Sequence, residues 1–421
     1  MYKLVIEGGT KLFGSLTAEG AKNSALPLLA ATLLASEKIT LNNMPHLSDV
    51  RTMLNLLKSF GAKVEDSELV KSKIVQLHTP KITSTLAPYE IVSTMRASVI
   101  VLGALLAREG IAEISLPGGC AIGDRPINYH LEAFEKMGAK ITLEEGYIKA
   151  EGKLKGAEIN FPIASVGATE NVIIAATLAE GTTTIYNAAR EPEIEDLAEM
   201  LNKMGAKITG AGSSKVQIIG VTKLAGCSHK VISDRIEAGS YLVAGIASGG
   251  SVKIDDIKPE YLDATIATLE AMNAKIETTE DSIKASYNGE ILPTSVVTRV
   301  HPGFPTDMQA QISTLMCLAK GTSTLEESIF ENRFMHIPEL NRMGANITID
   351  GKKIFVNGIE RFRAAEVMAT DLRASFSLVI AALNAKGTTS INRLYHLDRG
   401  YSHIEEKLDS LGGKAKRIQA Q

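Results

Sequence analysis

The chain has 421 residues, of which 45% are hydrophobic, with a formal net charge of −3 and a pI near 6.3. This length supplies enough apolar residues for more than one buried core. Basic residues are dispersed, so no nucleic-acid partner is expected. The longest apolar runs are shorter than the ~18 residues that span a bilayer, and the N-terminus carries no signal-peptide pattern. We therefore expect a cytoplasmic protein with no membrane partner.

The cysteines and histidines predict neither a metal nor another cofactor. Three cysteines without CxxC or metal-ligand spacing fit a reducing compartment, and the eight histidines form no HExxH pair. Cys317 lies in an apolar run and is expected to be a small buried hydrophobe. Cys227 fits either a structural or a reactive role.

An apolar, helix-like stretch recurs six times, and each copy runs into a turn residue that is usually glycine. About fourteen residues of α-helix span about 21 Å, so the residue that far before each turn is expected at a helix N-terminus. The six residues, which we expect to lie together, are Lys22, Arg96, Gly167, Arg235, Asp307 and Arg373. N–H groups at helix N-termini attract anions, which indicates a phosphate-binding pocket. The alternative is ordinary solvated charge in the first turn of a helix.

A second helix of each repeat is amphipathic and ends at a stop residue. Apolar positions such as Leu197, Leu201 and Met204 mark one buried face. The stops recur about every 70 residues, which indicates six copies of one unit. A glycine there fits the left-handed residue that ends a helix. The stops are Gly61, Gly138, Gly205, Asn273, Gly344 and Gly412.

The first helices are apolar almost all round, which favours helices enclosed by protein. Each unit then consists of a buried helix, a strand, a loop, an outer helix and a strand, and three units close one domain. The sequence therefore predicts an α/β protein with two domains, one of residues 21–231 and one of residues 1–20 plus 232–421. The strand at Lys3 to Glu7 is expected to cross over to the second domain.

Cys120 lies in a Gly-rich loop, Leu116 to Pro126, with Arg125 five residues further on. A nearby guanidinium favours the thiolate, which is both a nucleophile and a proton carrier. The alternative is a surface loop that happens to hold a cysteine. Arg399, in a tight turn, favours binding of phosphate or carboxylate. Glu191 and Glu331 fit a helix N-terminus and ligand binding equally well.

Several long motifs, in order along essentially the whole chain, resemble the UDP-N-acetylglucosamine 1-carboxyvinyltransferase family of enolpyruvyl transferases. They include Gly20-Ala21-Lys22-Asn23, Thr94-Met95-Arg96-Ala97-Ser98, the Cys120 loop, Ser165-Val166-Gly167-Ala168-Thr169, Pro305-Thr306-Asp307-Met308-Gln309, Glu331-Asn332-Arg333-Phe334 and Thr370-Asp371-Leu372-Arg373. The resemblance implies two inside-out α/β barrel domains, each of three repeated units with buried helices, facing across a cleft.

The resemblance also implies an activity. The family transfers the enolpyruvyl group of phosphoenolpyruvate to the 3-hydroxyl of UDP-N-acetylglucosamine and releases phosphate by addition and elimination. This is the first committed step of peptidoglycan synthesis, and so of cell-wall biogenesis, cell shape and cell division. The two substrates are the expected partners, fosfomycin the expected inhibitor, and a monomer or weak oligomer the expected state.

Residue roles follow from the same resemblance. Cys120 would be the general acid and Asp307 the base, while Lys22, Asn23, Arg125 and Arg399 would bind phosphoenolpyruvate. Asp371 and Arg373 would serve product release. The nucleotide sugar would contact Arg96, Arg125, Pro126, Ile127, Asn128, Tyr129, His130, Ser165, Val166, Gly167, Asp307 and Ile329. Where many relatives carry a lysine that lies near the diphosphate, this chain has Phe161-Pro162-Ile163-Ala164.

Two alternatives stay open. A relative of 5-enolpyruvylshikimate-3-phosphate synthase would share the fold but accept a small phosphorylated acid; the Cys120 loop and Ser165-Val166-Gly167 argue against it. An inactive nucleotide-sugar-binding relative would be expected to have lost Cys120 or Asp307, and both are present.

Overall fold

The computed structural model describes residues 2–116 and 127–419. These residues form two compact units. The first unit comprises residues 20–116 and 127–232, and the second comprises residues 2–19 and 233–419. The sequence predicts boundaries after residues 20 and 231. Each unit has its own cluster of buried apolar side chains, and the predicted α/β fold is confirmed.

The described strands form six four-stranded sheets, all with one pairing pattern. One edge strand pairs parallel with its neighbour, and the other two pairings are antiparallel. In the first unit the sheets contain β14 (Ser228–Lys230), β3 (Lys38–Asn42), β5 (Val75–His78) and β4 (Lys63–Glu65); β6 (Leu86–Ala87), β7 (Ile111–Ser115), β9 (Tyr147–Glu151) and β8 (Lys140–Glu144); β10 (Glu158–Asn160), β11 (Thr182–Tyr186), β13 (Lys215–Ile219) and β12 (Lys207–Thr209).

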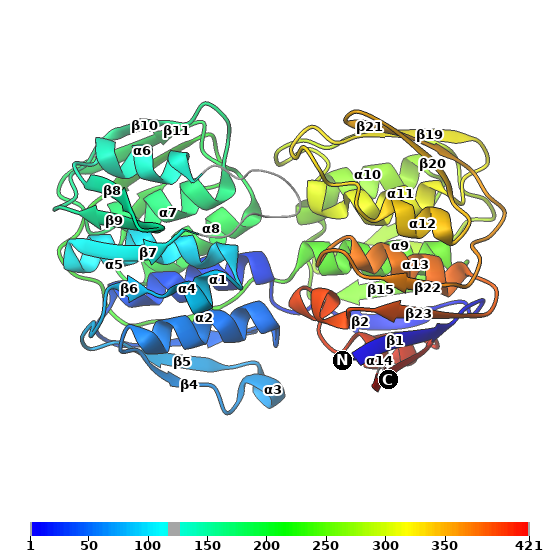
Figure 1. The fold of residues 1–421 in the computed structure, drawn as a ribbon, viewed down its shortest axis with the longest axis horizontal. Helices are drawn as coiled ribbons and strands as arrows, with labels where there is room; N and C mark the ends of the chain where they lie inside the picture. The colour runs from blue at the N-terminus through cyan, green and yellow to red at the C-terminus, as the bar shows by residue number, and fades with distance from the viewer. Residues whose placement is uncertain (1, 117–126, 420–421) are drawn as a thin grey trace. The chain divides into compact units, whose positions relative to one another are not determined.

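The second unit repeats this arrangement (Figure 1). Its sheets contain β2 (Phe13–Thr17), β15 (Ser251–Asp255), β17 (Ser282–Ser286) and β16 (Lys275–Thr278); β18 (Ser295–Val297), β19 (Thr322–Glu326), β21 (Lys353–Asn357) and β20 (Asn346–Asp350); β22 (Glu366–Met368), β23 (Thr388–Asn392), β1 (Tyr2–Glu7) and β24 (Lys414–Gln419). Three strands follow the outer helix in each of the first five repeats, such as β12, β13 and β14, where the sequence predicts one. The missed strands are short, which leaves no long periodic signal.

Four of the six parallel pairs are β–helix–β units, such as β10 and β11 around a buried helix. In the other two parallel pairs, the strand that precedes a buried helix pairs with the strand that follows a different buried helix. β2 precedes the first buried helix in the chain but pairs with β15, and β14 takes the corresponding place beside β3. β1 lies inside its sheet between β23 and β24, so residues Lys3 to Glu7 belong to the second unit.

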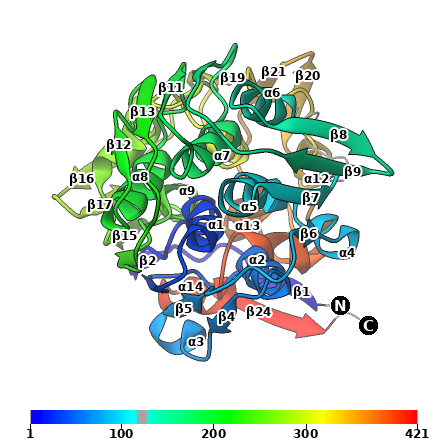
Figure 2. The same ribbon diagram turned by 90° about the vertical axis from the view of Figure 1, so that its left-hand side faces the viewer.

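Three buried helices lie at the centre of each unit, in contact with one another. Figure 2 shows α1 (Lys22–Ala31), α5 (Val101–Glu109) and α7 (Val166–Ala176) surrounded by strands. The counterparts in the second unit are α9 (Arg235–Ala247), α11 (Gln309–Met316) and α13 (Ser375–Asn384). Every residue of α9 is buried, as all-round apolar composition predicts. Helices α5 and α7 approach closely because position 103 is glycine: a Cβ there would lie 2.3 Å from Oδ1 of Asn171.

The outer helices end as predicted. They are α2 (Ser48–Ser59), α6 (Asn128–Lys136), α8 (Pro192–Lys203), α10 (Asp263–Ala271), α12 (Ile337–Arg342) and α14 (Ile404–Ser410). All six stop residues have positive φ, and Asn273 adopts it at 71° where the other repeats use glycine. Shorter helical segments are α3 (Leu69–Ser72), α4 (Tyr89–Val92), η1 (Thr32–Leu34), η2 (Arg96–Ile100), η3 (Pro259–Leu262), η4 (Thr306–Met308) and η5 (Leu394–Arg399).

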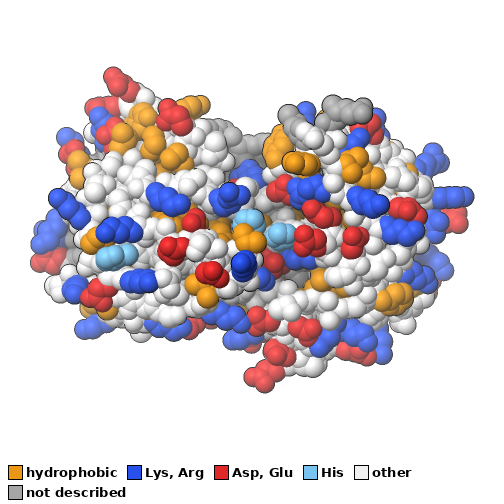
Figure 3. Space-filling model, turned by 90° about the horizontal axis from the view of Figure 1, so that it is seen from below, with side chains coloured by type: hydrophobic (Ala, Val, Ile, Leu, Met, Phe, Trp, Pro, Cys, Tyr) orange, Lys and Arg blue, Asp and Glu red, His pale blue; other side chains and the backbone are white. Residues whose placement is uncertain are grey.

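The surface carries mixed charge. On the face drawn in Figure 3, basic and acidic side chains are interspersed without a stripe of one sign. Within the described ranges, no helix has the length and apolar character that a bilayer crossing requires. The same residues contain no group of three or more histidine, cysteine or acidic side chains arranged to hold a metal ion.

Candidate functional site

The six polar or glycine residues of the repeat lie at helix starts. In the first unit Lys22 begins α1, Arg96 begins η2, which runs into α5, and Gly167 is the second residue of α7. In the second unit Arg235 begins α9, Asp307 lies in η4 just before α11, and Arg373 lies two residues before α13. The predicted position at helix N-termini is therefore confirmed within each unit.

Lys22 is nearly buried and pairs with an acid from the neighbouring helix. Its Nζ lies 3.4 Å from Oδ2 of Asp49 in the first turn of α2, and their side chains are 10% and 6% exposed. The cation is thereby held at the N-terminal end of α1, where the helix N–H groups add positive potential. Asn23, the next residue, is half-buried.

The start of α1 is also tied to α8 and β14. Ser24 donates a short hydrogen bond to Asp196, whose other oxygen lies 2.7 Å from Nε2 of His229. Nδ1 of His229 lies 3.2 Å from Nζ of Lys203. Because Ser24, Asp196 and His229 are all buried, this network fixes the turn that carries Lys22 and Asn23.

Two residues that the resemblance assigns to the nucleotide sugar, His130 and Gly167, lie side by side near the starts of α6 and α7. A Cβ on Gly167 would lie 3.5 Å from Cε1 of His130, so the imidazole lies against the first turn of α7. Nδ1 of His130 accepts a hydrogen bond from the Asn171 amide at 2.9 Å, which leaves the ring proton of the neutral form on Nε2. Ser165 caps α7 through its Oγ, which accepts from the Ala168 N–H at 3.4 Å.

The surroundings of this segment are partly apolar. Ile127 precedes α6, Asn128 begins it, and the ring of Tyr129 lies 6.3 Å from that of Phe161, centroid to centroid. Val166 begins α7, and Ile163 is 62% exposed. The predicted Cys120, Arg125 and Pro126 lie outside the described residues.

In the second unit, the starts of the three buried helices meet in a network of alternating charge. Asp307 is bound at Oδ1 by Nη2 of Arg333 at 2.7 Å, and its Oδ2 lies 3.6 Å from Nε of Arg373. Arg373 also lies 3.4 Å from Oδ2 of Asp234, the residue that caps α9. Both arginine side chains are about 5% exposed or less, while 24% of the Asp307 side chain is exposed. A partly exposed carboxylate is thus oriented by two buried cations.

The remaining predicted residues of the second unit occupy different places. Asp371 lies in the turn before α13, where its Oδ1 accepts the N–H groups of Arg373 and Ala374 at 2.9 and 2.8 Å. Ile329 lies in the loop after β19, with its N–H bound to Oε1 of Glu327 at 2.8 Å. Arg399 ends η5 and is half-buried. The acid beside it, Asp398, is bound by both Nη atoms of Arg417.

Glu170, on α7, is a buried carboxyl group of the first unit. It is 5% exposed, and its Oε1 has no hydrogen-bond partner among the described residues. Burial raises the pKa of Glu170 well above its usual value, and the nearby carboxylates Glu193 and Glu191 raise it further. Glu191 precedes α8, and Pro192 takes the first position of that helix.

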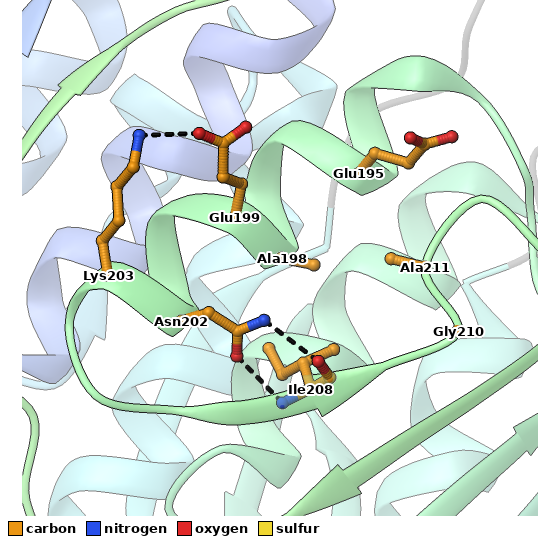
Figure 4. Close-up of a pocket in the computed structure, with 8 residues that line it drawn as sticks. All are labelled: Glu195, Ala198, Glu199, Asn202, Lys203, Ile208, Gly210 and Ala211. Atoms are coloured by element: carbon orange, nitrogen blue, oxygen red, sulfur yellow. Dashed lines mark hydrogen bonds and ion pairs between the residues drawn. The ribbon is translucent and has the colours of Figure 1, made fainter.

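A groove in the first unit lies apart from this site. Figure 4 shows it on the outer side of α8 and next to β12, lined by Glu195, Glu199, Lys203 and their neighbours. Lys203 pairs there with Glu199 at 2.7 Å. Since no residue of the predicted site lines this groove, it carries no part of the chemistry described above.

Sequence reasoning missed the partners that hold the site residues. Asp49, Asp234 and Arg333 each pair with a predicted residue, but they lie tens of residues away in sequence. Asp234 had a local signal, since an aspartate directly before an apolar helix is a typical N-cap. Arg333 lies in the Glu331-Asn332-Arg333 segment, whose polar composition marked it without indicating its partner.

Comparison with known proteins identifies the family. Residues 6–408 match the family described as EPSP synthase (3-phosphoshikimate 1-carboxyvinyltransferase). The chain is 52% identical over 422 residues to the UDP-N-acetylglucosamine 1-carboxyvinyltransferase of Psychrobacter sp. (strain PRwf-1), which covers 99% of this chain and 97% of the relative. The protein of that name from Acinetobacter baylyi (strain ATCC 33305 / BD413 / ADP1) is also 52% identical, covering 99% and 100%.

Two solved structures share the fold. The enolpyruvyl transferase NikO from Streptomyces tendae superposes with a TM-score of 0.89 at 23% identity, covering 100% of this chain and 99% of the other. EPSP synthase from Acinetobacter baumannii superposes with a TM-score of 0.75 at 20% identity, covering 100% of both chains. The family match, the relatives and the shared fold together place this chain among the α/β transferases with this repeated fold. The chain belongs to the EPSP synthase (carboxyvinyltransferase) family.

Proposed function

We propose that this protein transfers the enolpyruvyl group of phosphoenolpyruvate to the 3-hydroxyl of UDP-N-acetylglucosamine and releases phosphate. The observation that carries the proposal is Asp307, a partly exposed carboxylate oriented by Arg333 and Arg373. Such a group suits the removal of a hydroxyl proton. Full-length identity of 52% to relatives named for this activity supports the choice of acceptor.

The reaction divides into addition and elimination. In the addition, the Cys120 thiol gives its proton to the methylene carbon of phosphoenolpyruvate, and the adjacent carbon becomes cationic. The sugar 3-hydroxyl oxygen attacks that carbon while its proton passes to Asp307, and a tetrahedral ketal phosphate forms. Elimination returns a proton from the new methyl group to the Cys120 thiolate left by the addition, restores the double bond and expels phosphate with its bonding electron pair.

Positive charge makes both steps easier because the substrate carries a phosphate and a carboxylate. Lys22 provides a cation at the N-terminus of α1, and Arg125 and Arg399 provide guanidinium groups for the same anion. Asn23 stabilises the tetrahedral intermediate. Asp371 and Arg373, at the start of α13, act in product release.

The contacts proposed for the nucleotide sugar come from the resemblance. In the first unit it contacts the segment in which His130 lies against Gly167, together with Ser165, Val166 and residues 127–129, and also Arg96; Arg125 and Pro126 are further proposed contacts. In the second unit it contacts Asp307 and Ile329. The chain has Ile163, exposed to solvent, at the place where many relatives have a lysine near the diphosphate, so this position supplies no cation.

Within the cell the proposal places the enzyme in the cytoplasm, at the first committed step of peptidoglycan synthesis. It acts there as a monomer or weak oligomer, supports cell-wall growth, shape and division, and is inhibited by fosfomycin.

The test is an assay of inorganic phosphate with phosphoenolpyruvate and either UDP-N-acetylglucosamine or shikimate 3-phosphate as acceptor. We expect phosphate only with the nucleotide sugar, together with a product heavier by the enolpyruvyl unit in mass spectrometry. Asp307→Asn should lower kcat by about 10²- to 10⁴-fold, the usual contribution of a general base. Turnover of shikimate 3-phosphate alone would overturn the proposal, and so would full activity of a Cys120→Ser, Asp307→Ala double variant.

A further inference from the structure

Glu327 is a buried carboxylate in the second unit whose two oxygens serve different parts of the chain. It follows β19 directly and is 1% exposed. Oε2 accepts a hydrogen bond from the Thr306 hydroxyl at 2.7 Å. Oε1 accepts from the Thr298 hydroxyl at 2.8 Å and from the N–H groups of Ile329 and Phe330 at 2.8 and 3.1 Å.

The Oε2 side leads to Asp307. The Thr306 hydroxyl donates its one proton to Glu327, so its oxygen accepts from Nη1 of Arg333 at 2.8 Å. Nη2 of the same guanidinium donates to Asp307 at 2.7 Å, and the group lies 5.2 Å from the centroid of the Phe330 ring. The donor and the acceptor of each hydrogen bond between Asp307 and Glu327 are therefore fixed. Arg333 donates to both Asp307 and Thr306, and Thr306 donates to Glu327.

The Oε1 side holds the turn at residues 328–330. One carboxylate oxygen that accepts two successive N–H groups fixes the backbone of the turn, as an N-cap does at a helix start. Ile329 lies in this turn. Charge-assisted hydrogen bonds of this kind are stronger than neutral ones, and a buried acceptor is costly to leave unmatched.

We propose that Glu327 is a positioning residue that sets the proton acceptor Asp307 and the nucleotide-sugar contact at Ile329 together. This inference rests on the proposed function for the roles of those two residues, while the structural link itself does not depend on it. Glu327 touches no reacting atom in this scheme and acts only through Thr306, Arg333 and the turn.

The test uses variants that separate the two sides. Glu327→Gln keeps the shape but removes the charge and places an N–H₂ group where one oxygen accepted protons. Thr306→Val removes only the hydroxyl link to Arg333, and Thr306→Ser keeps it. Glu339→Gln is the matched control, because Glu339 in the same unit also accepts a backbone N–H, that of Met368 at 3.1 Å, away from the site.

Two readouts decide the matter. The first is steady-state kinetics: in Glu327→Gln we expect kcat to fall about tenfold or more, KM for UDP-N-acetylglucosamine to rise and KM for phosphoenolpyruvate to stay unchanged. The second is amide hydrogen exchange, which should accelerate at Ile329 and Phe330 in the same variant. Thr306→Val should lower kcat alone, without faster exchange, while Thr306→Ser and Glu339→Gln should behave as wild type.

The inference is overturned if exchange at Ile329 and Phe330 is unchanged in Glu327→Gln, or if Thr306→Val keeps the wild-type kcat. The exchange measurement needs no substrate, so it decides the structural link even if the wild-type protein uses another acceptor. Absence of turnover by the wild type with UDP-N-acetylglucosamine would instead count against the proposed function.

Discussion

Arg333 donates from Nη2 to Oδ1 of Asp307 at 2.7 Å and from Nη1 to the Thr306 hydroxyl at 2.8 Å. One guanidinium thus binds two consecutive residues at the start of the same buried helix. Its planar geometry fixes the direction in which the Asp307 carboxylate points, and a point charge could not do this.

Arg333→Lys should therefore lower kcat although it keeps the positive charge. Losing one charge-assisted hydrogen bond costs about 1.5–3 kcal/mol, which corresponds to a rate lower by about ten- to a hundredfold. Steady-state phosphate release measures this effect. Arg363→Lys, an exposed change in the same unit, should leave kcat unchanged. Equal rates for Arg333→Lys and wild type would show that Asp307 does not need this orientation.

Removal of Lys22 should affect stability as well as turnover. Lys22→Met leaves the nearly buried Asp49 without this cation, and breaking a buried pair costs about 3–5 kcal/mol. Adding Asp49→Asn should restore much of the unfolding free energy, whereas phosphate release should stay low in both variants. Urea denaturation and the phosphate assay separate the two effects. If the double variant recovers activity along with stability, Lys22 has a structural role only.

Fosfomycin should label Cys120 alone. Burial raises the pKa of Cys317 to about 12, and burial also raises the pKa of Cys227, with Lys203 opposing the shift. Both groups stay thiols at neutral pH and react poorly. Peptide mass spectrometry should find one adduct, on the peptide that contains Cys120, and none in Cys120→Ser. A label on Cys227 at neutral pH would contradict this order of reactivity.

Glu170→Gln should stabilise the first unit. The folded-state pKa of Glu170 lies above its unfolded value, so its contribution to stability is present at low pH and is lost as the pH rises through the folded pKa. The substitution should raise the free energy of unfolding by about 1 kcal/mol near pH 8 and by little near pH 4.5. Chemical denaturation at several pH values tests this, with the exposed change Glu158→Gln as the control. A gain of equal size at both pH values would assign the effect to packing instead.

Features that repeat within the sequence were predictable from it. The spacing of Gly61, Gly138 and Gly205 gives the ends of the outer helices, and their positive φ confirms the reason for glycine there. The apolar runs of α1 and α13 likewise predict buried helices. These signals are local, since helix propensity and turn geometry depend on neighbouring residues.

Features that depend on distant contacts were not predictable. The pairing of β2 with β15 and of β14 with β3 depends on which strands meet after folding. The cations around Asp307 come from separate repeats, and no periodic pattern relates Arg333 to Asp307. The resemblance supplied the predicted roles, but the residues that orient those side chains required coordinates.

The pairing of β1 has a consequence for protein synthesis. Leu4 and Ile6 are fully buried in the finished sheet, but their partners β23 and β24 begin only at Thr388 and Lys414. β1 therefore emerges from the ribosome long before β23 and β24, the two strands with which it pairs. The strands of the first unit are complete once β14 has emerged. A chain that ends before residue 388, by contrast, lacks both strands with which β1 pairs.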